Sequence, residues 1–155
     1  MKSLVMSAIL ALGFLAHPAI AEEELPTPDV IACLKAIEPL DLRYRGWMQP
    51  QCLDYAAHIC VTIDRGTGTC LSELVGSMRA FYAALSPLLP NTIEGSGFQA
   101  RGYELALERV ADTFENVPKC VELDGYEFTT CEYVHLGVAT IDLFYRARLA
   151  EVSLP

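Results

Sequence analysis

The cysteines constrain this chain more than any other feature of its sequence. An even number of cysteines in a short chain that enters an oxidising compartment predicts disulfide bonds. Metal coordination and haem attachment are disfavoured, because the sequence contains neither a Cys-x-x-Cys pair nor a Cys-x-x-Cys-His motif. We therefore expect disulfides, no metal and no other cofactor. The six residues are Cys33, Cys52, Cys60, Cys70, Cys120 and Cys131.

The N-terminus predicts that the chain reaches such a compartment. Residues 1–21 carry one basic residue, Lys2, then an apolar run and a small-residue ending at Ala21, which is the layout of a cleavable signal peptide. The run is too short to span a bilayer comfortably, because a membrane helix needs about 20 apolar residues. No cysteine that could accept a lipid lies near Ala21. We expect cleavage after Ala21, a periplasmic or secreted location and no membrane anchor.

Residues 22–155 are expected to form one helical domain, since domains most often have about 100–150 residues. The whole chain has a net charge of −9, and loss of Lys2 with the signal peptide makes it −10. This charge repels nucleic acid and anionic membranes, so neither is an expected partner. A cationic protein, in contrast, would be attracted.

Apolar residues recur at helical spacing through most of the chain, and no segment alternates with a period of two. The pattern predicts an all-α fold, a small disulfide-stapled bundle of about five helices. The first is expected to begin at Thr27 as its N-cap and to end at Pro39. Residues 40–48 stay unassigned, because their tyrosine and tryptophan favour burial whereas their arginines and glycine favour a turn. The other helices are expected over about 50–61, 71–85, 103–117 and 129–147.

The last expected helix has two further features. Thr129 and Glu132 have the spacing of a capping box, which predicts that the helix starts there, after a turn at Asp124 and Gly125. Its apolar residues form two stripes, so a helix apolar on most of its circumference is expected in the middle of the bundle. One stripe is Tyr133, Leu136, Thr140, Leu143, Phe144 and Ala147, and the other is Val134, Val138, Ile141 and Tyr145.

Two segments of the chain, residues 60–70 and 120–131, resemble each other. Each begins Cys-Val-x-aliphatic-Asp, continues through a loop and ends in Thr-Cys, and a helix with a Phe-Tyr pair follows. The repeat predicts two helix-loop-helix units, with Cys60 bonded to Cys70 and Cys120 to Cys131. Cys33 and Cys52 then form the third pair. Six cysteines allow 15 pairings, and the others stay open at this point.

Residues 60–150 resemble the lysozyme inhibitor LprI-like N-terminal domain family, which consists of small exported helical domains of bacteria. Cys60 and Cys70 are similar to the early cysteine pair of that family, and Cys120 and Cys131 to the late pair. Residues 78–82, Met-Arg-Ala-Phe-Tyr, lie where the family has a Leu-Asn-x-x-Tyr motif, with arginine in place of asparagine. The resemblance implies a helical fold and an inhibitor of lysozyme or a related cell-wall hydrolase.

The sequence shows no catalytic motif, so we do not expect an enzyme. It contains neither a Gly-x-Ser-x-Gly elbow nor a His-Glu-x-x-His helix nor a phosphate-binding glycine loop. His58 has Asp54 four residues before it, and His135 has Glu132 three residues before it, which would suit a general base. The favoured interpretation of both is a partly buried histidine with a local acidic neighbour.

A binding role is more easily placed in a loop, because loops on a rigid scaffold often carry binding residues. Asp124, Tyr126 and Glu127 are the candidate binding residues, although a plain solvent-exposed connection is the commoner role of such a loop. We expect an exported, acidic binding module that inhibits a cationic cell-wall hydrolase. The alternatives are a periplasmic immunity protein that neutralises a toxin and a structural or assembly accessory of the cell envelope.

Overall fold

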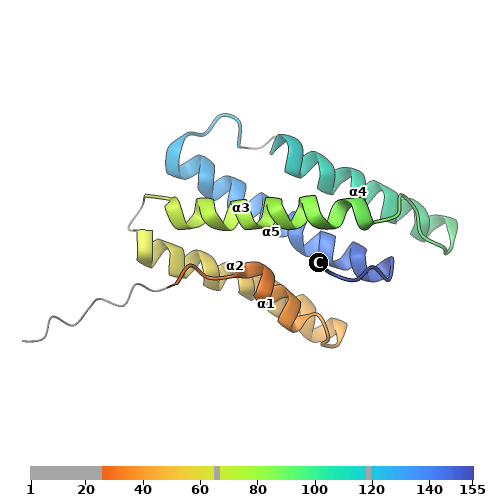
Figure 1. Ribbon diagram of the computed structural model, residues 1–155. Helices are drawn as coiled ribbons and strands as arrows, with labels where there is room; N and C mark the ends of the chain where they lie inside the picture. Colours follow the sequence, from red (N-terminus) through yellow and green to blue (C-terminus); the bar gives the residue numbers. More distant parts are fainter. Residues whose placement is uncertain (1–25, 65–66, 118–119) are drawn as a thin grey trace, which may run out of the picture.

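The structure is a computed structural model that describes residues 26–64, 67–117 and 120–155, so the predicted signal peptide and its cleavage site lie outside the described residues. The described part contains five α-helices, one short 3-10 helix and no strand (Figure 1). This confirms the expected small, all-α, disulfide-stapled bundle. The elements are α1 (Val30–Ile37), α2 (Leu42–Asp64), α3 (Thr69–Leu85), η1 (Ser86–Leu88), α4 (Gly97–Asn116) and α5 (Gly125–Leu149).

Helices α3 and α5 run side by side through the middle of the bundle (Figure 1). Phe81 of α3 stacks on Phe144 of α5 with ring centroids 4.8 Å apart. Helix α4 packs against α5 on one side, where Tyr82 of α3 stacks on Phe114 of α4, while α1 and α2 cover the other side as a hairpin. None of the described helices combines the length and the apolar character that crossing a membrane requires.

Helix α5 is less buried than its sequence predicts. The first apolar stripe, which includes Tyr133, Leu136 and Phe144, is buried as expected. The second stripe is not, because Val134 is 52% and Val138 61% exposed. Helix α4 covers only part of this side, and it leaves a groove of about 510 Å³ along α5. Helix α5 thus lies in the middle of the bundle, as expected, but its second stripe is only partly covered.

Three disulfides join elements that follow each other along the chain. Their pairing is the one that the internal repeat predicts: Cys33–Cys52, Cys60–Cys70 and Cys120–Cys131. The first joins α1 to α2, and the second joins the end of α2 to the start of α3. The third joins the α4–α5 connection to α5, so one of its cysteines lies outside a helix. Bridges of this loop length contribute roughly 2–4 kcal/mol each, mainly by restricting the unfolded chain.

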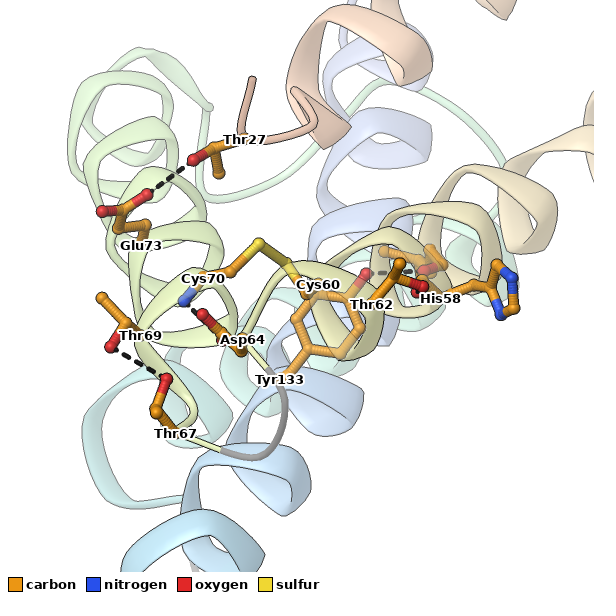
Figure 2. The surroundings of a disulfide bond; sticks show 11 residues. Thr27, His58, Cys60, Thr62, Asp64, Thr67, Thr69, Cys70, Glu73 and Tyr133 are labelled. Atoms are coloured by element: carbon orange, nitrogen blue, oxygen red, sulfur yellow. Dashed lines mark hydrogen bonds between the residues drawn. A yellow bond between two sulfur atoms is a disulfide. The ribbon is translucent and has the colours of Figure 1, made fainter. Parts of the chain in front are cut away.

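The surroundings of the Cys60–Cys70 disulfide show how α3 begins (Figure 2). Gly68 precedes the helix with a φ of +79°, a conformation that glycine adopts readily but that offers no side chain for a cap. The carboxylate of Asp64, the last residue of α2, supplies the missing acceptor, because it accepts from the Cys70 backbone N–H at 2.7 Å. The bridge and this hydrogen bond together hold the end of α2 against the start of α3.

Two helices begin where the sequence does not predict. The N-cap of α1 is Asp29, whose carboxylate accepts from the Ala32 backbone N–H at 2.8 Å, whereas the Thr27 hydroxyl bonds Glu73 of α3. Helix α5 begins at Gly125, so the expected capping box is wrong: the Thr129 hydroxyl donates to the Gly125 carbonyl inside the helix. Gly125 has a φ of +51°, which allows the chain to enter the helix at this earlier point.

Helix α2 includes the unassigned residues 40–48 almost entirely and contains Pro50 in its interior. The burial of its side chains is the reverse of what their residue types suggest. Arg45 is only 4% exposed and its guanidinium bonds the Glu38 carboxylate at 2.8 Å, whereas Trp47 is 79% exposed. The buried arginine is tolerated because a carboxylate pairs with it.

Helix α4 also starts earlier than the expected position 103. The Ser96 hydroxyl accepts from the Gln99 backbone N–H and the Gln99 side chain accepts from the Ser96 backbone N–H, which is a capping box. The Ser-x-x-Gln spacing is visible in the sequence, but the glycines on both sides of Ser96 conceal it, since they favour a loop.

Candidate protein-binding surface

The three predicted binding residues lie at the start of α5 instead of in a loop. Asp124 is the N-cap residue, although its side chain makes no capping hydrogen bond, and Tyr126 and Glu127 belong to the first turn. Tyr126 and Glu127 line a shallow hollow of about 460 Å³, together with Val134. Asp124 does not line it. The structure therefore brings two of the three predicted residues together.

Tyr126 also has a structural role. A Cβ atom at Gly68 would lie 3.4 Å from the ring of Tyr126, so the ring packs against the turn that precedes α3. The two Cys-loop-Cys units consequently meet at one end of the bundle (Figure 1). Since part of the ring is used in this contact, the side chain that is most available for a partner here is Glu127.

The two histidines of the described residues do not form a general base with their acidic neighbours. No hydrogen bond or ion pair joins His58 to Asp54 in the described part of the chain, and the His58 ring points away from the nearby disulfide (Figure 2). Glu132 pairs with Arg79 of α3 instead of His135. His135 is partly buried, as expected, whereas His58 is exposed, so the interpretation of His58 as a partly buried histidine is wrong.

One group of side chains has the composition of a metal site. The sulfur atoms of Cys120 and Cys131 and a ring nitrogen of His135 lie within 4.8 Å of one another. The two sulfurs, however, form a disulfide with each other. Because the thiolate is the form of cysteine that binds a metal, this group offers only the histidine as a ligand in the oxidised protein.

The most prominent exposed feature is an aromatic face on α2 that the sequence analysis did not find. We define the α2 aromatic face as Tyr44, Trp47, Met48 and Tyr55, which are all exposed. Their spacings of three, four, seven and eight residues place them on one side of the helix. At 1.5 Å per residue, the face extends about 16 Å along α2. Disulfides from two buried cysteines of the same helix, Cys52 and Cys60, join it to α1 and α3.

The sequence contains a signal for this face. The buried side of α2 carries Cys52, Leu53, Ala56 and Cys60, and the same helical register, continued toward the N-terminus, brings Arg45 to that side. Trp47 then falls on the outside. Pro50 conceals the continuity, because proline usually breaks a helix interior.

Comparison of the chain with models of protein families, with curated proteins and with solved structures finds no match.

Proposed function

We propose that this chain is an exported protein-binding module that inhibits a cationic cell-wall hydrolase, of which lysozyme is the model case. The observation that carries the proposal is the α2 aromatic face. Trp47 and the two tyrosines expose large apolar surfaces side by side, although burial would stabilise them. Tryptophan and tyrosine are also the residue types that contribute most to protein–protein affinity.

The scaffold supports a binding role, because it holds the α2 aromatic face in one conformation before the partner arrives. Helix α2 is joined to α1 and to α3 by disulfides. Its buried side is fixed further by the Arg45–Glu38 ion pair. A preorganised surface loses less conformational entropy on binding, so more of the contact energy appears as affinity.

The charge of the chain supports a cationic partner. Acidic side chains number 20 and basic ones 11 in the whole sequence. Complementary charge raises the rate of association more than it raises affinity, and it does so most at low salt. The resemblance of residues 60–150 to the LprI-like family favours a hydrolase of the cell wall as the partner over other cationic proteins.

Lysis of bacterial cells by lysozyme, with and without purified oxidised protein, tests the proposal. We expect micromolar protein to reduce the lytic rate, and Trp47→Ala to weaken this inhibition at least tenfold, since central interface aromatics contribute about 2 kcal/mol or more. Leu105→Ala is the matched control, because Leu105 is an exposed apolar residue of α4 outside this face. Undiminished lysis would contradict inhibition of lysozyme.

Affinity capture with the same variants separates this proposal from its rivals. A toxin that is retained by the wild type and lost with Trp47→Ala would favour a periplasmic immunity protein. An envelope complex retained in the same way would favour an assembly accessory. A basic hydrolase retained by the wild type and by Leu105→Ala, and lost with Trp47→Ala, is the result expected here.

A further inference from the structure

A long groove follows α5 on the side of the bundle where α4 lies. The groove of about 510 Å³ and the hollow of about 460 Å³ adjoin, because Val134 and His135 line both. We call the two together the α4–α5 groove. Its lining extends along α5 from Tyr126 to Asp142, which at 1.5 Å per residue is about 24 Å. A helix of about 16 residues has this length.

The lining of the α4–α5 groove includes apolar side chains that a partner can reach. Val134 and Val138, four residues apart on one side of α5, are both more than half exposed. Leu123, which is also exposed, extends this apolar surface beyond the start of α5. Removal of these side chains from water favours a partner that covers them.

The walls of the groove favour a helix over an extended peptide as the partner. Both walls are mainly α-helix, so their backbone groups are bonded within each helix. The Thr113 hydroxyl donates to the Arg109 carbonyl, and the Thr130 hydroxyl donates to a carbonyl of its own helix in the same way. An extended peptide would therefore bury backbone groups with few partners, which is costly. A helix satisfies these groups itself and lays its apolar side into such a groove.

The charges of the groove indicate which kind of helix fits. Carboxylates line both walls, with Asp112 on α4 and with Glu127 and Asp142 on α5. Arg109 opposes them in the lining, and Arg146 reaches Asp142 at 3.4 Å. The whole chain adds to the negative balance, with 20 acidic and 11 basic side chains. Basic residues on either side of an apolar stripe would therefore meet complementary charge.

The same charge disfavours a second copy of this chain as the occupant. Each copy carries a net charge of −9 over the whole sequence, so two copies repel each other. A basic partner is attracted instead.

We propose that the α4–α5 groove binds a basic amphipathic helix of another protein, about 16 residues long. The apolar side of this helix covers Val134 and Val138, and its basic residues lie near Asp112 and Asp142. The proposal goes beyond the inhibitor function and uses none of the residues of the α2 aromatic face. Because α2 lies on the other side of the bundle from α4, either proposal can fail while the other holds (Figure 1).

Isothermal titration of the oxidised protein with three synthetic peptides tests the proposal. The first peptide has a leucine stripe at helical spacing and lysines elsewhere, the second has glutamates in place of the lysines, and the third is the lysine peptide with prolines in its interior. We expect saturable binding of the lysine peptide and at least tenfold weaker binding of the other two, because glutamate reverses the charge and proline prevents the helix. Equal binding of the glutamate or the proline peptide would overturn the assignment of a basic helix, and absence of saturable binding of the lysine peptide would overturn the site.

Two variants with the same change of charge locate the binding site. Val138→Arg places a cation in the groove, and Val61→Arg places one at an exposed position of α2. Both valines are more than half exposed, so we expect both variants to keep a thermal midpoint close to that of the wild type. Val138→Arg should weaken binding of the lysine peptide at least tenfold, whereas Val61→Arg and Trp47→Ala should leave it within about twofold of the wild type. Similar affinity in the two arginine variants would mean general attraction to an acidic protein and would contradict the proposal.

Sedimentation of the free protein tests the second copy as the occupant. We expect a monomer at the concentrations used for the titration. A dimer that Val138→Arg dissociates and Val61→Arg does not would overturn the proposal in favour of self-association through the α4–α5 groove.

Discussion

Two polar side chains, Arg45 and Tyr133, hold α2 against the rest of the bundle. Arg45 bonds Glu38 just after α1, and Arg148 of α5 reaches the same carboxylate at 3.3 Å. The Tyr133 hydroxyl of α5 donates to the Leu53 carbonyl of α2 at 2.7 Å, in a buried position. Such contacts do not drive folding, but their loss leaves buried groups without partners, which is costly.

Because of Tyr133, the stability of the folded protein depends on pH in the alkaline range. Burial raises the pKa of Tyr133 above its ordinary value of 10.0, and the negative charge of Asp54 adds to the shift. The unfolded chain therefore loses this proton from about pH 10 while the folded protein keeps it, so the free energy of unfolding falls as the pH rises above about 10. Below pH 10 the group contributes no pH dependence.

We expect Tyr133→Phe to lower the free energy of unfolding by about 1 kcal/mol at pH 7, because the hydrogen bond to Leu53 is lost. The decline of stability between pH 10 and 11 should become shallower. Urea denaturation at pH 7, 10 and 11 measures both effects. Tyr55→Phe is the control, since Tyr55 is exposed and should keep the wild-type pH dependence. An unchanged alkaline decline in Tyr133→Phe would refute the assignment.

Among the elements, the sequence predicts the strongly periodic helices well and their ends poorly. The apolar period from Leu71 to Leu85 identifies the body of α3, and the body of α4 follows in the same way. The ends depend on single local contacts, such as the Asp29 cap or the Asp64 carboxylate at Cys70, which several polar residues nearby could make equally well. Periodicity does not distinguish between them.

Two glycines show how differently two helices are packed. Gly137 of α5 is buried against α2, and a Cβ there would lie 2.9 Å from a methyl carbon of Leu53. Gly76 of α3 is exposed, and a Cβ there meets no atom within 4 Å. An alanine at position 137 would therefore displace the Leu53 side chain, whereas an alanine at position 76 would displace nothing.

We expect Gly76→Ala to raise the free energy of unfolding by up to about 1 kcal/mol, because alanine favours a helix. Gly137→Ala should lower it by about 1 kcal/mol, since overpacking exceeds the same gain in helix propensity. Chemical denaturation of the two variants gives the comparison directly. Stabilisation of similar size in both would show that α2 and α5 are not in close contact at this position.

At the scale of the whole molecule, we expect each disulfide to stabilise the folded protein by a similar amount. The bonded cysteines are separated by 19, 10 and 11 residues. Loop-closure entropy changes slowly over this range, so we expect each Cys→Ala pair, such as Cys60→Ala with Cys70→Ala, to cost about 3 kcal/mol. Urea unfolding without reductant measures the loss. A loss below about 1 kcal/mol would mean that the unfolded chain is not restricted by that bridge.

The candidate surfaces were harder to predict from sequence than the fold. The cysteine repeat identifies two bridges because it depends on local order along the chain, and the two cysteines outside the repeat form the third. The α2 aromatic face depends on which side of a helix faces the core, and that choice is made by the buried Arg45 and the interior Pro50, both contrary to their usual behaviour. The α4–α5 groove is lined by residues of two different helices, which no local pattern reveals.

The order of the disulfides has a consequence for biosynthesis. The first cysteine is bonded to the second, the third to the fourth and the fifth to the sixth, so no bridge encloses or crosses another. A chain whose N-terminus emerges first can thus form each bridge as soon as the second cysteine of that pair appears. An oxidase that joins cysteines in order of appearance yields the native set, without reshuffling by an isomerase.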